Sequence, residues 1–230
     1  MLRARRLDPD QPWAVADDEP RQALKENLQS DDDARVLHAL ELVPAMQVEL
    51  TSDLEKLLQH DSRPVRVRAL ELVGNLGKPS SADSIKVLLL DEDQDLRAAS
   101  VRAFMAVAGE KGIRTISPFL TDDSVEVQAA AAAALVKHGG LDGILTAAET
   151  RKSLLSGEAP ERRRAGARVL GESKVQSFFS PVLELLGDDD RSVRLAAIEA
   201  AAQMKRHELM QALEYRLAAT NLGEAAARAQ

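Results

Sequence analysis

The chain has no cysteine, and aromatic residues make up only 3% of its 230 residues. Without cysteine it can form no disulfide, no Cys-ligated zinc site, no iron–sulfur cluster and no cysteine-linked chromophore, and it has no thiol nucleophile. The scarcity of aromatic side chains leaves few platforms on which a base or a sugar ring can stack. These absences remove several classes of enzyme and weaken the case for a nucleic-acid-binding protein.

Long apolar runs and an excess of basic residues are also missing. The apolar segment Ala129–Val136 is far shorter than the roughly 18 residues that a membrane-spanning helix needs. The basic N-terminus, 1–8, is not followed by the apolar stretch of a secretion signal. The net charge is −7, whereas phosphate backbones attract clusters of Lys and Arg. We therefore expect a cytoplasmic protein that binds no nucleic acid and inserts no segment into a membrane.

Residues typical of catalytic, metal or phosphate sites do not occur at the spacing those sites need. The four histidines are far apart, and His207-Glu208 is the only His-Glu pair. Gly139-Gly140 is not followed by the Lys-Ser or Lys-Thr of a phosphate-binding loop, and it predicts a helix end instead. We therefore predict no catalytic residue, no metal site and no cofactor, and so a protein that is not an enzyme.

What the sequence does contain is a repeat of about 31 residues. Each copy has a Leu, an acidic residue three positions later, an Arg five positions after that, then a small residue and an apolar residue. The copies begin at Leu28, Leu58, Leu89, Leu120, Leu155 and Leu186. A period of this length indicates helical units stacked in a row, whose core grows with each added unit.

The small and apolar positions of the repeat predict close packing between helices. The small position holds Ala39, Ala69, Ser100, Ala131, Gly166 and Ala197. The apolar position, four residues later, holds Val43, Val73, Phe104, Leu135, Leu170 and Ala201. A spacing of four places both positions on one helix face. The run Ala129–Ala134 predicts the tightest packing in the fourth copy, because alanine favours helix and allows short distances between helices.

The acidic and basic positions predict contacts at the turns. The acidic position holds Asp31, Asp61, Glu92, Asp123, Glu158 and Asp189, and we expect it to cap the helix that follows. The basic position holds Arg66, Arg97, Gln128, Arg163 and Arg194, with Val36 in the first copy. We expect these arginines to pair with the acidic turn of their own or the next copy, and so to fix the register between copies.

The repeat predicts six pairs of helices, each pair joined by an acidic turn. The expected pairs are 20–29 with 33–45, 52–60 with 65–76, 82–90 with 95–108, 112–121 with 124–138, 141–156 with 160–171, and 175–187 with 191–205. A terminal helix is expected at 207–219. The chain then divides into an irregular lead-in at 1–19, a solenoid at 20–220 and a tail at 221–230. In the lead-in, we expect Trp13 either to cap the first repeat or to contact a neighbouring domain.

The segment Leu58–Gly74, which reads LQHDSRPVRVRALELVG, resembles HEAT repeats, in particular the short bacterial HEAT-like class that also occurs in phycobilin lyases. The resemblance covers about 20–220, with Gln128 in place of Arg and four extra residues in the fifth copy as departures. It implies an all-α, right-handed α-α superhelix whose second helices line the concave surface. It also implies a noncatalytic scaffold or adaptor that binds a protein partner.

On that surface, partner binding is expected where the copies differ. Two outward positions of the second helices vary in charge, and the arginine run 162–164 is the main basic cluster. One position holds Glu41, Glu71, Arg102, Ala133, Arg168 and Glu199, and the other holds Asn75, Ala106, Lys137, Glu172 and Gln203. Mixed charge suits a protein partner better than a phosphate track. The candidate partner-binding residues are Glu71, Arg102, Lys137, Arg164, Arg168, Glu172 and Glu199.

Two alternative functions remain open at this point. An Arg-rich start followed by a Trp and HEAT-like units is similar to the soluble segment of bacterial nucleotide-translocase-like fusion proteins. That similarity implies a cytoplasmic regulatory domain tethered to the inner membrane, with the adjoining domains of a larger chain as its partners. The other alternative is a phycobilin lyase-like enzyme, because lyases share this repeat, although the low aromatic content does not favour a bilin-binding cleft.

Overall fold

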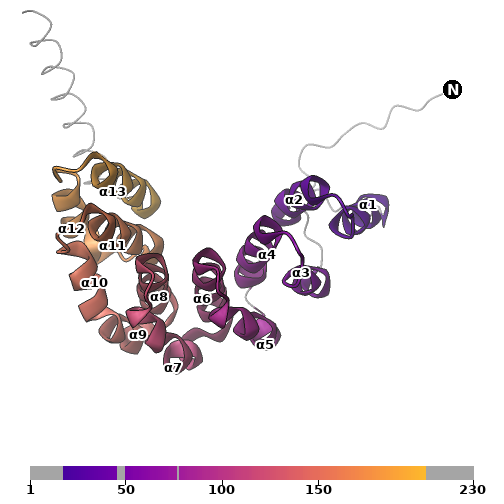
Figure 1. Cartoon of the computed structure of the whole chain (residues 1–230), viewed down its shortest axis with the longest axis horizontal. Helices are drawn as coiled ribbons and strands as arrows, with labels where there is room; N and C mark the ends of the chain where they lie inside the picture. The colour runs from indigo at the N-terminus through magenta and orange to yellow at the C-terminus, as the bar shows by residue number, and fades with distance from the viewer. Residues whose placement is uncertain (1–17, 46–49, 77, 206–230) are drawn as a thin grey trace, which may run out of the picture.

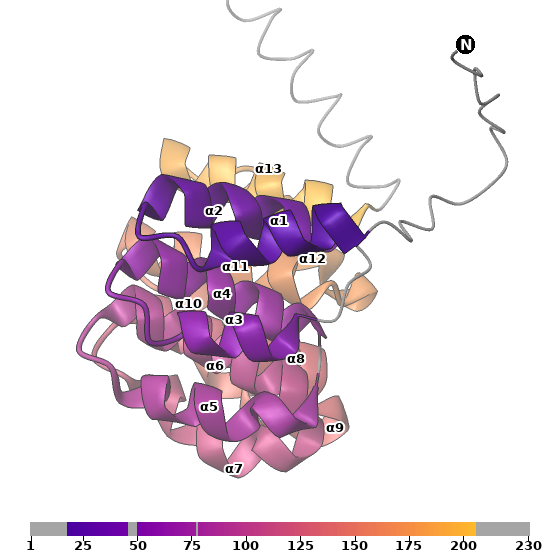
Figure 2. The ribbon, with the colours of Figure 1, turned by 90° about the vertical axis from the view of Figure 1, so that its right-hand side faces the viewer.

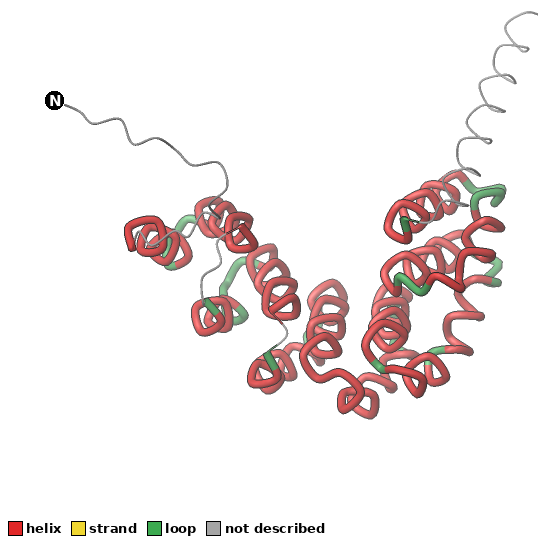
Figure 3. Tube along the Cα trace, turned by 180° about the vertical axis from the view of Figure 1, so that it is seen from behind, coloured by secondary structure: helices red, strands yellow, loops and turns green. Residues whose placement is uncertain are grey.

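The repeat folds into an arc of helices arranged in two layers (Figure 1). The structure is a computed structural model, and it describes residues 18–45, 50–76 and 78–205. Within these ranges all regular elements are helices, joined by short loops (Figure 3). The expected terminal helix 207–219, the tail 221–230 and Trp13 lie outside the described residues.

The outer layer consists of the first helix of each unit, and the inner layer of the second. The outer helices are α1 (Asp18–Leu28), α3 (Thr51–Leu57), α5 (Ala82–Lys86), α7 (Ile113–Ile116), α9 (Gly140–Thr146), α10 (Ala148–Leu155) and α12 (Phe179–Leu185). The inner helices are α2 (Asp33–Leu42), α4 (Arg63–Leu76), α6 (Gln94–Ala108), α8 (Val125–His138), α11 (Pro160–Ser173) and α13 (Arg191–Met204). The units stack one on another (Figure 2), and the inner helices line the concave side of the arc, as predicted (Figure 1).

The six predicted helix pairs are all present, with local differences. The expected long helix 141–156 is wrong, because the chain forms two helices, α9 and α10, that meet at the buried Ala147. Short 3-10 turns extend several outer helices, including Val87–Leu90 after α5 and Ser117–Thr121 after α7. Helix α1 begins at Asp18, two residues before the expected start.

The small and apolar positions of the repeat form the core, as predicted. All members of both columns are buried. A Cβ atom on Gly166 would lie 2.9 Å from Cδ2 of Leu155, so the absence of a side chain lets α11 approach α10. Ala129–Ala134 are buried on every face of α8, because this helix is enclosed by its neighbours on both sides and by the outer layer.

In four units, the arginine of the repeat binds backbone carbonyl groups in the acidic turn of its own unit. The guanidinium group of Arg97 donates to the backbone carbonyl oxygens of Asp91 and Glu92 at 2.8 and 2.9 Å. Equivalent bonds are made by Arg66 to His60 and Asp61, by Arg163 to Gly157 and Glu158, and by Arg194 to Asp188 and Asp189. These carbonyl groups follow the outer helix, so each arginine ties the end of that helix to the start of the inner one.

Two arginines also reach the next unit, as the register hypothesis requires. Arg97 donates to both carboxylate oxygens of Asp122 at 3.1 and 3.3 Å, and Arg163 to those of Asp188 at 2.6 and 2.9 Å. At the fourth unit, Gln128 donates only to the carbonyl oxygen of Asp122, and the residue in the next unit that corresponds to Asp122 is Gly157. The carboxylate clamp is therefore absent between the fourth and fifth units, where both of its partners are replaced.

The predicted capping role of the acidic column is wrong by one residue. At three inner helices the N-cap is an aspartate one position after the column, and its carboxylate accepts from backbone N–H groups of that helix; these residues are Asp32, Asp93 and Asp190. The N-cap residues of α8 and α11, Ser124 and Ala159, make no such side-chain bond. Of the column residues, Asp61, Glu92, Glu158 and Asp189 instead supply the carbonyl oxygens that the arginines bind. The sequence pattern located the turn correctly but not the hydrogen-bonding register within it.

Candidate functional site in the concave groove

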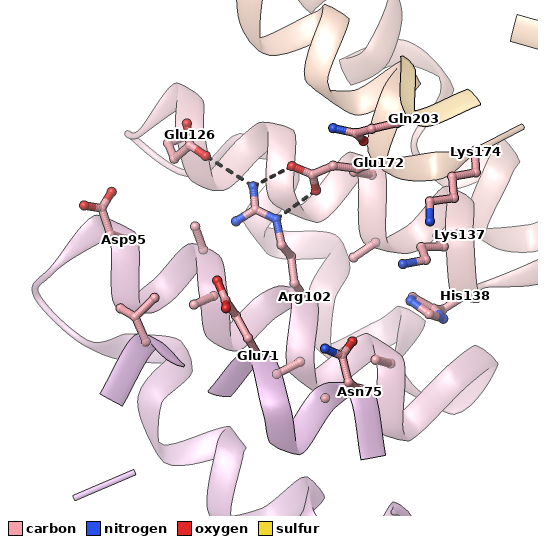
Figure 4. Close-up of a pocket in the computed structure, with 18 residues that line it drawn as sticks. Glu71, Asn75, Asp95, Arg102, Glu126, Lys137, His138, Glu172, Lys174 and Gln203 are labelled. Atoms are coloured by element: carbon pink, nitrogen blue, oxygen red, sulfur yellow. Dashed lines mark hydrogen bonds and ion pairs between the residues drawn. The ribbon is translucent and has the colours of Figure 1, made fainter. Parts of the chain in front are cut away.

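A cavity of about 530 Å³ opens on the concave side of the arc, between the inner helices α4, α6, α8, α11 and α13 (Figure 4). The outward positions of the repeat, which were predicted to face this surface, converge on it. The residues from those positions that line the cavity are Glu71, Asn75, Arg102, Ala106, Ala133, Lys137, Glu172 and Gln203. Eight of the eighteen lining residues therefore come from the positions at which the repeats differ from one another, whereas Glu41, Arg168 and Glu199 from the same positions lie outside the lining.

Small residues form part of the cavity wall. Gly74 of α4 and the alanines 98, 99, 103 and 106 of α6 and 133 and 134 of α8 all contribute to it. A Cβ atom on Gly74 would lie 2.9 Å from the Cα atom of Ala103, so α4 and α6 are nearly in backbone contact at this point. The wall between the charged side chains is consequently smooth, apolar and free of aromatic rings.

Arg102 lies at the centre of the charged groups and connects three inner helices. Its Nε and Nη2 atoms donate to the two carboxylate oxygens of Glu172 on α11 at 2.8 and 3.1 Å. Nη2 also donates to Glu126 of α8 at 3.2 Å (Figure 4). The bond from α6 to α11 passes over α8, whose residue at the corresponding outward position is only Ala133. We name this set of ion pairs, Arg102, Glu126, Glu172 and Arg168, the concave bridge.

Opposing effects act on the guanidinium group of Arg102. Burial acts to lower its pKa, while the charges and hydrogen bonds of Glu172 and Glu126 act to raise it, and the pKa lies above its usual value as a result. Arg168 of α11 forms an ion pair with Glu126 from the other side, and its Nε is buried without a hydrogen-bond partner among the described residues. The concave bridge therefore joins the third, fourth and fifth units.

The end of the cavity that is formed by the C-terminal ends of α8 and α11 is basic. Lys137 and His138 come from the last turn of α8, and Lys174 is the left-handed C-cap residue of α11, with φ 54°. Figure 4 shows the three side chains close together at one side of the cavity. Burial, and then the charge of Lys137, lower the pKa of His138, so this imidazole is neutral near pH 7.

The candidate residues named from the sequence fall into three groups. Arg102, Glu172, Lys137 and Glu71 line the cavity, and Glu71 pairs with Arg68 at 2.7 Å. Arg168 belongs to the concave bridge without lining the cavity. Arg164 and Glu199 are exposed and lie outside the cavity lining.

The arginine run 162–164 does not form one basic patch. Arg162 donates to Ser153 at 2.9 Å, Arg163 belongs to the inter-unit clamp and Arg164 is exposed. Successive residues of a helix point about 100° apart, so a run in sequence does not become a cluster in space.

Three charged residues of the cavity lining, Asp95, Glu126 and Lys174, were not singled out from the sequence. Asp95 and Glu126 occupy the first turns of α6 and α8, and Lys174 follows the last turn of α11. All three lie outside the outward positions of the repeat. A search for charged residues at the helix ends of adjacent copies would have found them.

Among the described residues, no group of three or more His, Asp or Glu side chains is arranged to hold a metal ion. No described helix combines the length and the apolar composition needed to cross a bilayer.

Comparison with known proteins identifies the repeat. The family model for HEAT repeats matches residues 51–140 and 148–230, which is more than half of the chain. No curated protein matches the sequence.

Similar solved structures include the CpcE–CpcF complex of phycocyanin lyase from Nostoc sp. PCC7120, at 16% identity and a TM-score of 0.47, covering 93% of this chain and 99% of that one. Human deoxyhypusine hydroxylase in complex with glycerol is 13% identical, with a TM-score of 0.46 and coverages of 86% and 89%. The YibA protein of E. coli is 14% identical, with a TM-score of 0.48 and coverages of 92% and 93%. Likenesses this distant do not bear on function.

Proposed function

The chain belongs to the HEAT-repeat family, and we propose that it is a noncatalytic scaffold that binds a protein partner in its concave groove. One observation carries this proposal. The positions that recur in every unit are used for packing and for the turns, whereas eight residues from the outward positions that vary line one cavity of about 530 Å³. Residues that vary around a constant framework are free to specify a partner.

The chemistry of the groove supports a protein partner. Its lining combines apolar alanines with acidic, basic and amide side chains. Protein–protein interfaces typically have such a mixture, with an apolar centre and polar groups that form about one hydrogen bond per 100–200 Å². A surface for nucleic acid would instead present a continuous basic track, and the chain as a whole carries a net charge of −7.

A crosslinking experiment tests the proposal, because the chain has no native cysteine. One cysteine is introduced in the groove by Ala106→Cys and, in a matched variant, on the outer helix α10 by Ala148→Cys. Both alanines are half-buried in helices. Each variant is labelled with a maleimide-linked benzophenone, irradiated in an extract of the source cells, and its adducts are identified by mass spectrometry. The purified partner is then crosslinked to both variants.

The expected result is one defined protein adduct from Ala106→Cys that forms again with the purified partner and is absent from Ala148→Cys. Adducts from α10 alone would move the binding surface to the outer layer. The lack of any adduct at the groove position would contradict the proposed scaffold function.

A further inference from the structure

The charges that line the cavity are not all satisfied within the molecule. Each carboxylate in the lining has an arginine partner: Glu71 pairs with Arg68, Asp95 with Arg63, Glu172 with Arg102, and Glu126 with both Arg102 and Arg168. Lys137 and Lys174 line the same cavity and form no ion pair with any described residue. Among the described residues, the charged groups of the lining that lack an ion-pair partner are therefore these two lysines, both at the basic end of the groove.

We propose that the basic end of the groove binds an acidic peptide segment of the partner, with carboxylates of that segment paired to Lys137 and Lys174. This inference rests on the proposed scaffold function and specifies the chemistry of its partner. The four groups that would make the contact are Lys137, Lys174, Asn75 and Gln203.

The two lysines are held so that one segment can reach both. Lys137 ends α8 and Lys174 ends α11, so the backbones of two packed neighbouring helices fix their origins. Lysine carries a compact charge on a flexible stem, which suits carboxylates whose spacing varies along a peptide. His138 beside them is half-buried, whereas Lys137 and Lys174 are both exposed, so their charges are accessible to an incoming segment.

The amide groups favour a peptide over a free anion. Asn75 of α4 and Gln203 of α13 are exposed, line the cavity and have no hydrogen-bond partner among the described residues. An amide side chain both donates and accepts hydrogen bonds, so it can bind the N–H and C=O groups of an incoming backbone. The alanine wall between α6 and α8 leaves room for small side chains on that segment.

Nucleic acid fits the same groups less well. Base recognition outside a duplex uses aromatic stacking, and the lining contains no Phe, Tyr or Trp. The remaining positive group of the lining is Arg102, which is already bound by carboxylates, so a phosphate chain would meet only the two lysines. The carboxylates of an acidic peptide need no more than that.

Fluorescence anisotropy with defined probes tests the inference. The probes are a fluorescein-labelled peptide of alternating Ala and Glu, a matched peptide of alternating Ala and Gln, and a single-stranded DNA of similar length. They are titrated with the native chain, with the double variant Lys137→Ala/Lys174→Ala, and with the control Lys86→Ala/Lys152→Ala. The control removes the same charge from exposed positions on the outer helices α5 and α10.

We expect the Ala–Glu peptide to bind about tenfold more weakly to the groove variant, a change of about 1.4 kcal/mol, and within about twofold of native affinity to the control. The Ala–Gln peptide should bind the native chain more weakly than the Ala–Glu peptide does. An equal loss in both variants, no binding of the Ala–Glu peptide up to about 1 mM, or lysine-dependent binding of the DNA at equal or higher affinity would each overturn the inference.

Crosslinking to the purified partner distinguishes failure of this inference from failure of the scaffold function on which it rests. If the groove label still captures that partner with unchanged affinity in Lys137→Ala/Lys174→Ala, the scaffold function stands and the acidic-peptide inference fails. If the groove label captures no partner, the proposed function itself fails. Loss of capture in the lysine variant, with capture retained in the control, supports both.

Discussion

Removing the side chain of Arg102 should destabilise the solenoid although this residue lies on the concave surface. The side chain donates three hydrogen bonds to charged acceptors on two other helices, at 2.8, 3.1 and 3.2 Å. A hydrogen bond to a charged group contributes about 1.5–3 kcal/mol where water is excluded, whereas exposed ion pairs contribute about 0–1 kcal/mol. The side chains of Arg102 and Glu172 are 35% and 30% exposed. We therefore expect a pairwise energy between these limits, about 1–1.5 kcal/mol.

A double-mutant cycle measures that pairwise energy. Arg102→Ala, Glu172→Ala and the combined variant are unfolded with urea and followed by far-ultraviolet circular dichroism, and the non-additive part of the change in unfolding free energy is the coupling. The same cycle on Arg68 and Glu71 provides the control, because that pair lies within one helix turn and is more exposed. The control should give about 0.3 kcal/mol.

The outcome depends on whether solvent competes at the concave bridge. A coupling for Arg102 and Glu172 no larger than that of the control pair would refute the reasoning, since it would mean that contact between three helices adds nothing beyond a surface ion pair. Repeating the cycle at high salt is a second check. Salt should reduce the coupling of the control pair by the larger fraction, because partly buried charges are screened less than exposed ones.

Two further predictions concern packing and pH. Gly74→Val should lower the unfolding free energy by about 1–3 kcal/mol in urea denaturation, because the Cβ atom of the new side chain would lie 2.9 Å from the Cα atom of Ala103. The control is Asn75→Val at the neighbouring exposed position, which should change the unfolding free energy by less than about 0.5 kcal/mol. The pKa of Asp188 is lowered by hydrogen bonding from Arg163, and that of Asp190 by hydrogen bonding from Ser192. Each carboxylate therefore stabilises the fold at a pH above the ordinary pKa of 3.8, and this contribution is lost as the pH falls through the lowered pKa. The melting temperature measured from pH 6 to below pH 3 should therefore fall less steeply in Asp188→Asn than in the native chain; an unchanged slope would contradict the assignment.

The architecture was predictable from the sequence because each unit packs through residues at the same positions of the repeat. A buried small residue and a buried apolar residue recur at fixed offsets, as Ala69 with Val73 and Ala197 with Ala201 show. The helix pairs follow from that periodicity. The division of the fifth outer helix at Ala147 was not predictable in the same way, because the four extra residues of that unit have no counterpart in the other copies.

The site was predictable only where the outward positions of the repeat describe it. Arg102, Lys137 and Glu172 belong to those positions and line the cavity. The sequence does not reveal that Arg102 and Glu172, which are 70 residues apart, bind each other. It also suggested a basic patch at 162–164, whereas the basic end is made by Lys137 and Lys174 at the ends of two helices. Pairing of side chains across units depends on the curvature of the arc, which a pattern within one unit does not contain.

The exchange of Arg and Asp for Gln128 and Gly157 has a mechanical consequence. The third and fourth units are clamped at their turns by Arg97 and Asp122, and the fifth and sixth by Arg163 and Asp188, but the junction between these two blocks has no such clamp. At that junction an ion pair of the concave bridge, between Arg168 of α11 and Glu126 in the first turn of α8, connects the two units instead. A guest that separates this pair from inside the groove would therefore remove a side-chain contact between the fourth and fifth units, and the angle between these units would be less constrained.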